Sequence, residues 1–381
     1  MNIHNHLPFV VDVRSTRDRE GYELAALMVK ATYNLPAQGE LATVAAEQVP
    51  WAYADVLVGP EANPVSLYEA ELSEEKVHPE YVVLGSAHSQ DGKPRQHLPF
   101  GIGIGKHSKY LVAAGPRVWR SGWMGGRADD IAAVQSVQLS YGLSFGGLDP
   151  SRAERDDAWC EFNPVGTGYC ADPDHRLADG MRMPQFEPMN QRFEKPVKDF
   201  PVLGLGPVAR SSAPRAAWAG TYDEEWQHKV WPNLPADFDA RFFQSTSQDQ
   251  WLPAIQAGDE IVLKYLTAAQ SRFGSVVKFQ LPAMEFVATV HPRRGASTRV
   301  QLRPDTLVFE PDAGRFFVIA RRTFALNESL LEIEAVSFGE PAQREQLAPI
   351  VPTFIDLEDL REQLRVARSP AGSLVNGGPK Q

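Results

Sequence analysis

Residues 98–113 read LPFGIGIGKHSKYLVA, and this stretch decides the fold class. Apolar residues alternate with glycine over Leu98–Gly105, and a second apolar run, Lys109–Ala113, follows at hairpin distance. A period of two places successive side chains on opposite faces of a strand, and two such runs close together are typical of a β-hairpin. We therefore predict a hairpin whose glycines allow a neighbouring backbone to pack closely.

Similar short runs recur on both sides of this hairpin. Upstream, Tyr22–Leu35 ends in β-branched and aromatic residues before a Pro-Ala-Gln-Gly turn, which favours a long strand over a helix. Further strands are expected at Tyr81–Gly85, Val134–Phe145, Glu260–Leu266, Val276–Leu281, Glu285–Val290, Thr298–Leu302, Thr306–Glu310, Arg315–Ala320 and Leu330–Val336. This pattern predicts a mainly β protein with sandwich- or barrel-like sheets and few short helices.

The stretch 149–259 interrupts the pattern. It is rich in proline, glycine and aromatic residues, and aromatic side chains at such density normally bury. We expect an irregular but ordered segment across the sheets, with short helices capped by Asp223 and Asp237. The predicted parts are a β-rich part at 1–148, this segment at 149–259, a second β-rich part at 260–340 that packs with the first as one large unit, and a helix with a flexible tail at 341–381.

The composition excludes several classes of protein. The chain has 381 residues, 43% hydrophobic and 23% charged, which is typical of a globular protein. Its 38 Lys and Arg against 48 Asp and Glu give a net charge of −10, which disfavours nucleic-acid binding and a polybasic membrane surface. No long apolar run and no secretory signal are apparent, so we expect a cytoplasmic protein without a membrane span.

The sequence contains no assembled cofactor or metal motif. The glycine-rich Gly101–Lys106 lacks the spacing of a phosphate-binding loop. Cys160, Cys170 and His175 lack the spacing of a zinc site. Two cysteines also exclude a disulfide framework, although they leave open whether the two residues pair. We therefore expect no cofactor and no metal.

Three aspartates are candidates for acid–base chemistry. Asp223, Asp237 and Asp239 lie close together in the sequence, and two of them could serve as the acid and base of a hydrolase or sugar-active enzyme. Helix capping and local charge pairing explain the same residues without catalysis.

Tryptophan and arginine residues are candidates for protein binding, because these residue types are typical interface anchors. The candidates are Trp159, Trp218, Trp226, Trp231, Arg241 and the basic turn Arg293-Arg294. Burial in a core and exposed turn charges are the alternative interpretations of the same residues. Residue chemistry alone favours a binding protein over an enzyme, without identifying the ligand.

The order of several motifs resembles a bacterial family first catalogued as a domain of unknown function. The motifs are Phe145-Gly146-Gly147, NPVGTGY at 163–169, Gly206-Pro207-Val208, GTYDEEW at 220–226, PNLP at 232–235 and DFDARFF at 237–243. Members of that family are encoded beside type VI secretion clusters and are regarded as effector adaptors or chaperones. The resemblance covers roughly residues 1–340. It implies a non-catalytic protein that binds a secreted effector and helps to load it onto the secretion spike protein.

Most motif residues are expected to be structural, with glycines for unusual backbone angles and aspartates for helix caps. They are Asn163, Gly166, Gly168, Tyr169, Gly220, Tyr222, Asp223, Asp237 and Asp239. Two rival functions remain open. One is the carboxylate-dependent enzyme described above, and the other is a structural component of the secretion apparatus, which would form stable oligomers without an effector.

Overall fold

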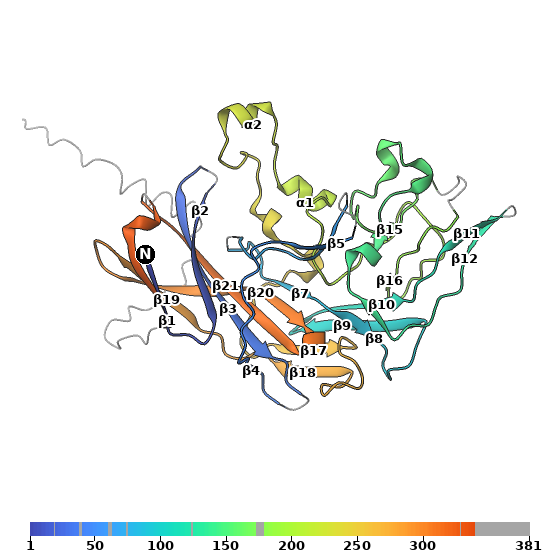
Figure 1. Ribbon diagram of the computed structural model, residues 1–381, viewed down its shortest axis with the longest axis horizontal. Coiled ribbons are helices and arrows are strands. Elements are labelled where there is room, and N and C mark those ends of the chain that lie inside the picture. Colours follow the sequence, from blue (N-terminus) through green and yellow to red (C-terminus); the bar gives the residue numbers. More distant parts are fainter. Residues whose placement is uncertain are drawn as a thin grey trace, which may run out of the picture. The chain divides into compact units, whose positions relative to one another are not determined.

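The computed structural model describes residues 1–339 except 19, 38–39, 60–62, 74, 123–124, 173–178 and 328. All of them belong to one compact unit, and the chain is divided after residue 340. The helix and tail expected at 341–381 lie outside the described residues. The protein is mainly β, as predicted, with only short helices (Figure 1).

The larger of two main sheets has nine strands in the described part of the chain. Its order is β1-β22-β19-β20-β21-β3-β2, with β4 added to β3 and β7 added to β20. The strands are β1 (Asn2–Asn5), β2 (Val10–Arg17), β3 (Glu23–Asn34), β4 (Thr43–Val44), β7 (Glu80–Val83), β19 (Phe286–Pro292), β20 (Thr298–Glu310), β21 (Arg315–Ala325) and β22 (Ile333–Phe338). Strands from both ends of the chain therefore share this sheet.

The second sheet comprises, among the described residues, five strands in the order β16-β10-β9-β17-β18. The strands are β9 (His97–Ile104), β10 (His107–Ala114), β16 (Phe186–Pro188), β17 (Glu260–Lys264) and β18 (Val276–Gln280). The predicted glycine-rich hairpin is β9-β10, which confirms that interpretation. At Gly101 a Cβ atom would lie 2.4 Å from the carbonyl oxygen of Lys109, so only glycine fits this close approach.

The main hydrophobic core lies between the two sheets. On β3, alternate residues such as Leu27, Val29 and Tyr33 contribute to it, together with Phe100 of β9 and Leu263 of β17. Each fully buried apolar side chain of this size contributes about 1.5–3 kcal/mol relative to its exposed state.

The opposite face of the large sheet is buried too. Met28 of β3 and Phe317 and Ile319 of β21 form a second cluster with Trp51 and Val82. A strand that is covered on both faces reads as a continuous apolar run, which explains the sequence of β3. Two charged residues of these strands, Lys30 and Arg321, are nevertheless fully buried.

Short elements make up the remainder. They are β5 (Val56–Val58), β6 (Val65–Tyr68), β8 (Ser86–His88), β11 (Trp119–Gly122), β12 (Gly125–Ala128), β13 (Ser136–Gln138), β14 (Phe145–Gly146), β15 (Thr167–Gly168), α1 (Ala213–Trp218) and α2 (Glu224–Lys229). The 3₁₀ helices are Tyr141–Leu143, Pro150–Arg152, Asp156–Ala158, Ala240–Phe243, Gln248–Gln250, Pro311–Ala313 and Leu330–Glu332. In Figure 1, α2 stands at the tip of a lobe away from the sheets.

Several predicted boundaries were wrong. The two strands expected at 298–302 and 306–310 form one strand, β20, whose pairing with β21 shifts register between Pro304 and Thr306. The expected strand Val134–Phe145 contains only β13, a 3₁₀ turn and the start of β14. No helix of the described residues is long and apolar enough to cross a membrane.

Candidate functional site

Two neighbouring hollows share lining residues, and the inner one lies on the second face of the large sheet. The inner cavity has a volume of about 230 Å³, and the more open outer groove has about 470 Å³. Glu69 and Arg210 line both, so the groove continues into the cavity at this point. The inner walls are largely apolar and include Val308, Ile319 and Phe242.

A buried ion pair crosses the floor between β3 and the segment after β6. Lys30 Nζ donates to both carboxylate oxygens of Glu71, at 2.6 and 2.8 Å, and to the Pro50 carbonyl at 2.8 Å. The Tyr68 hydroxyl and the Ala52 amide donate to the same carboxylate. Burial lowers the pKa of Lys30, and the Glu71 carboxylate opposes that effect. Burial, followed by the neighbouring Glu71 charge, raises the pKa of Tyr68 well above its usual value.

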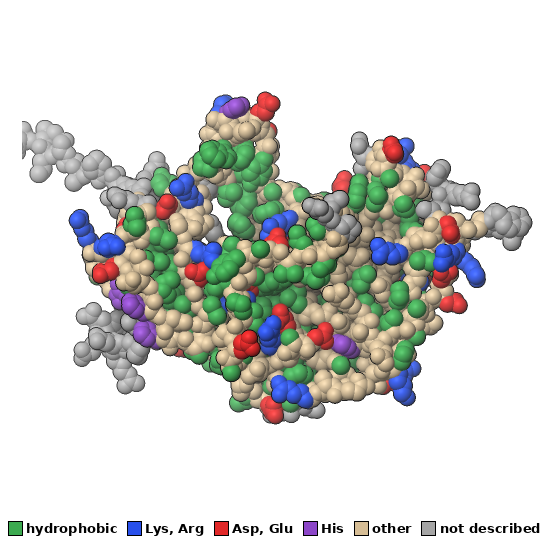
Figure 2. All heavy atoms as spheres, in the orientation of Figure 1, with side chains coloured by type: hydrophobic (Ala, Val, Ile, Leu, Met, Phe, Trp, Pro, Cys, Tyr) green, Lys and Arg blue, Asp and Glu red, His purple; other side chains and the backbone are tan. Residues whose placement is uncertain are grey.

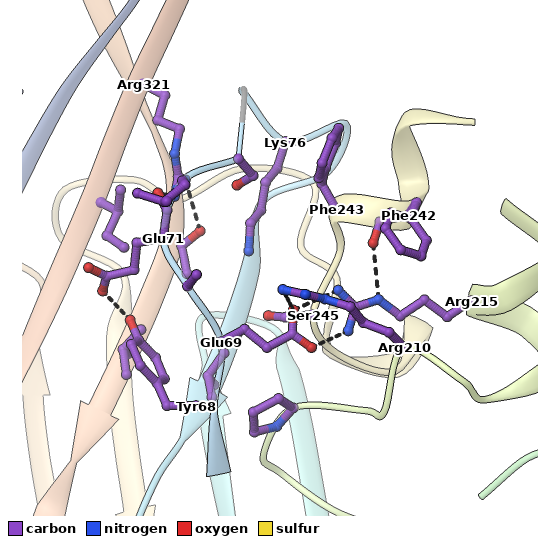
Figure 3. Close-up of a pocket in the computed structure, with 18 residues that line it drawn as sticks. Tyr68, Glu69, Glu71, Lys76, Arg210, Arg215, Phe242, Phe243, Ser245 and Arg321 are labelled. Carbon is purple, nitrogen blue, oxygen red and sulfur yellow. Dashed lines mark hydrogen bonds and ion pairs between the residues drawn. The ribbon is translucent and has the colours of Figure 1, made fainter. Parts of the chain in front are cut away.

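Arg215 and Arg321 also line the cavity, and both are buried. Arg321 bonds to Asp305 and donates to the Glu71 carbonyl at 3.2 Å. Arg215 of α1 holds Glu69 through both carboxylate oxygens (Figure 3). Paired arginine–carboxylate forks fix geometry as well as charge. The pairs thus tie α1 and the segment after β6 to the sheet.

Glu80 of β7 is a further buried anchor of this region. Its carboxylate is paired with Lys76 and accepts hydrogen bonds from the amides and hydroxyls of Ser245 and Thr246. Burial alone would raise the pKa of Glu80, but Lys76 and the two hydroxyl groups together lower it. The carboxylate is therefore held ionised and fastens the middle segment to β7.

These pairs determine what the cavity can do chemically. The carboxylates that line it, Glu69 and Glu71, are each bonded to a buried cation. A general acid or base needs a polarised group free to exchange a proton with a substrate. In the parts of the chain that are described, no group of three or more His, Cys, Asp or Glu residues could hold a metal ion. The paired charges hold the walls of the cavity in fixed positions.

The outer groove lies between the β5-β6 hairpin and the loop around Trp159. Leu57 and Ser66 line it from the hairpin, and Trp159 and Pro164 line it from the loop. Trp159 is 42% exposed. Arg210 lies at the junction with the inner cavity, where it bonds to Asp55 at 3.0 Å.

The other candidate tryptophans lie elsewhere. Trp218 packs against Trp251 at 5.8 Å between ring centroids, and the Arg241 guanidinium lies 5.0 Å from the Trp218 ring. Trp226 and Trp231 belong to the lobe around α2. The candidate tryptophans thus lie on three different segments, namely the loop that lines the groove, α1 and the lobe.

The lobe at 220–243 carries exposed aromatic side chains. Trp231 is 67% exposed and Tyr222 is half exposed. Tyr222 packs edge-on against Trp226 at 4.7 Å, and the Trp226 indole donates to the Asn233 carbonyl at 2.9 Å. Hydrophobic side chains gather below the tip of this lobe (Figure 2).

The basic turn lies in the connection between β19 and β20 of the large sheet. Arg293 and Arg294 follow β19, and both residues are exposed. Arg293 Nε donates to the Leu331 carbonyl at 2.7 Å. Neither residue lines the groove or the cavity described above.

The NPVGTGY motif builds the support of the groove. Asn163 is buried and donates to the carbonyls of Tyr141 and Phe145, both at 2.9 Å. Gly168 has a φ of +89°, and Gly166 approaches the Ser144 carbonyl so closely that a Cβ atom would lie 2.6 Å from it. These residues have structural contacts. Tyr169 likewise packs in a cluster that also contains Phe145, Cys160, Met183, Phe193 and Phe200.

The three aspartates of the motifs GTYDEEW and DFDARFF, Asp223, Asp237 and Asp239, each have a different hydrogen-bond partner. Asp223 caps α2 by accepting from the Trp226 amide at 2.8 Å, as predicted. Asp237 does not cap a helix. It accepts from the Thr221 amide at 2.9 Å and thereby stabilises the turn at Gly220, whose φ is +81°.

Asp239 takes the capping position that was expected for Asp237. Its carboxylate accepts from the Arg241 amide at 2.9 Å at the start of the 3₁₀ helix Ala240–Phe243. It also pairs with the Arg241 side chain, and this hydrogen bond lowers the pKa of Asp239. The cap lies two residues later than expected because the helix begins only at Ala240.

Cys160 and Cys170 are both buried and unpaired. Burial raises the pKa of both thiols, to about 11 for Cys170. Reactive cysteines have lowered pKa values, so these two are inert packing residues.

A family model described as "Uncharacterized protein conserved in bacteria (DUF2169)" matches residues 20–321. The chain belongs to the DUF2169 family. No curated protein and no solved structure matches it. The match spans the cavity, the groove, the lobe and all motif residues of this DUF2169 protein.

Sequence reasoning missed the buried charges of the DUF2169 cavity. Lys30, Glu69 and Glu71 were not singled out, and Arg215 was noted only as a residue of the motif series. Arg321 was placed after a strand although it lies within β21. One signal was available: Lys30 is a lone lysine in the apolar run LAALMVKATY. A charge inside such a run indicates a buried ion pair.

Proposed function

We propose that this DUF2169 protein is an adaptor, or chaperone, that binds a type VI secretion effector and helps to load it onto the secretion spike. The motif order supports this proposal, because it resembles a family of effector adaptors. The match to the DUF2169 family establishes membership of a family conserved in bacteria, and the adaptor role is the proposal.

The observation that carries the proposal is the contrast between interior and surface. The charged groups of the cavity are paired with each other, whereas large apolar side chains such as Trp159, Tyr222 and Trp231 are exposed on irregular segments. Exposed aromatic residues on a rigid scaffold are typical of protein-binding sites.

The rival enzyme has less support from the geometry. Thr221 lowers the pKa of Asp237 through hydrogen bonds, and the Arg241 side chain lowers that of Asp239. A glycosidase acid needs the opposite, a raised pKa. Substituting Asp239→Asn should consequently leave partner binding unchanged, whereas an enzyme would lose turnover.

The test combines capture with secretion. The tagged chain is purified from the native bacterium, and a protein that copurifies at near-equal stoichiometry is identified by mass. The gene is then deleted, and the captured protein is measured in the culture medium. We expect its secretion to fall while secretion of the tube and spike continues. Loss of tube secretion as well would instead indicate a structural component of the apparatus.

A partnerless monomer from cells with an active secretion system would contradict the adaptor function. Stable oligomers of the chain alone, measured by sedimentation, would favour the structural component.

A further inference from the structure

The β5 strand has an unusual combination of composition and exposure. Its three residues, Val56, Leu57 and Val58, are all apolar and are 49%, 50% and 42% exposed. In the described part of the chain, β5 pairs only with β6, so its other edge has no strand beside it. An exposed apolar edge of this kind is a template for pairing with another chain.

Two edge strands of the main sheets carry charged side chains. β2 carries the ion pair of Asp12 and Arg14, and β18 carries Lys278 paired with Glu260 at 2.8 Å. Charges on an edge strand are a common defence against unwanted pairing. β5 has no charged residue, so its exposed edge lacks this defence.

The outer groove adjoins this strand and extends the apolar surface. Leu57 lines one wall, and Trp159 and Pro164 line the other. Phe162, on the same loop as Trp159, is 61% exposed. An added strand would therefore find side-chain contacts as well as backbone hydrogen-bonding groups, the two components of strand addition.

Charge determines the kind of segment that fits. The charged groups in the groove, Asp55, Glu69 and Arg210, are already bonded to one another, and Glu69 is also bonded to Arg215. This set of two carboxylates and two guanidinium groups has no net charge. The groove thus offers no unpaired charge to an ionic ligand, and an uncharged, apolar segment is its complement.

We infer that β5 and the outer groove bind an extended apolar segment of a partner protein, which adds a strand at β5 and packs against Trp159. The inference rests on the proposed function in taking the partner to be the effector. A second copy of the chain is the alternative occupant, and the test below distinguishes the two.

Photocrosslinking in the native bacterium provides the test. A photoreactive p-benzoylphenylalanine replaces Leu57 in the full chain, and the matched control places it at Leu41, which is 81% exposed on another strand connection. We expect position 57 to crosslink to one contiguous stretch of one protein, and position 41 to give no such product. That stretch is then made as a synthetic peptide.

The peptide's Kd is measured by fluorescence anisotropy. We expect Leu57→Glu and Trp159→Ala each to weaken binding at least tenfold, and Leu41→Glu to leave it unchanged. Thermal melting of each variant identifies any loss of folding, and the crosslink at position 57 provides a readout that does not depend on those variants.

Two results overturn the inference and leave the adaptor function intact. One is a captured effector that depends on the chain for secretion but gives no crosslink from position 57. The other is a crosslink from position 57 to a second copy of the chain. If no partner is captured at all, the adaptor function fails and the inference fails with it.

Discussion

Replacing Lys30 with methionine tests whether the buried ion pair organises the cavity. The side chains of Lys30 and Glu71 are 1% and 3% exposed, so the substitution leaves the buried Glu71 without its cation. Methionine is similar in length and keeps the contact with the Phe317 ring, over which the Lys30 amine lies at 4.2 Å. The change therefore removes a charge and three hydrogen bonds with little change in volume.

The expected loss follows from what remains around Glu71. Breaking a buried ion pair by removing one partner costs about 3–5 kcal/mol. The Ala52 amide and the Tyr68 hydroxyl still donate to Glu71, so we place the cost near the lower end, at about 3 kcal/mol. This is a large fraction of the roughly 5–15 kcal/mol by which a domain is stable.

The assay is urea unfolding followed by circular dichroism, with a double-mutant cycle as the control. Lys30→Met combined with Glu71→Gln removes both charges and keeps the acceptor for Ala52 and Tyr68. We expect the double variant to recover about 2 kcal/mol of the loss. A loss below about 1 kcal/mol for Lys30→Met, or a double variant as unstable as the sum of the single ones, would refute the reasoning.

Three further results are expected. Because the pKa of Glu80 is lowered in the folded state, its contribution to stability is present above the unfolded pKa of about 4.5 and is lost as pH falls through the folded pKa. The free energy of unfolding of Glu80→Gln in urea should therefore fall less steeply than that of the unsubstituted protein between pH 6 and pH 3. Cys160 and Cys170 should react with a thiol reagent only after unfolding, and rapid labelling of the native chain would contradict their burial. Gly168→Ala should lower the free energy of unfolding by about 2 kcal/mol or more, because φ is +89° and the new Cβ would lie 2.5 Å from a proline ring carbon. The control Gly180→Ala, with a φ of +79° and open space around the new Cβ, should lower it by about 1 kcal/mol. Thermal melting of both variants measures the difference.

The strands of this fold were predictable because they carry a local signal. The alternating β9-β10 hairpin and the apolar β3 run are visible within a window of about ten residues. The irregularity in β20 shows the limit of such a window. Pro304 indicates an interruption, but the pairing of β20 with β21 continues past it. Tertiary pairing therefore decides whether a proline ends a strand.

The cavity was not predictable by the same reasoning, because its contacts are distant in the sequence. Lys30 and Glu71 are 41 positions apart, and Glu69 and Arg215 are 146 apart. The apolar run around Lys30 indicates locally that this charge is buried, but it does not indicate which carboxylate pairs with it. Only the fold brings these opposite charges together on one face of β3 and β21.

The buried pairs and the exposed groove depend on each other physically. Glu69 is held by Arg215 from α1 and also approaches Arg210, which lines both hollows. The floor of the groove is thus fixed by the same carboxylate that ties α1 to the sheet. A groove that is fixed before its ligand arrives loses little conformational freedom on binding, so more of the contact energy contributes to affinity. Ion pairs that add little to stability by themselves can in this way preserve the shape of a binding surface.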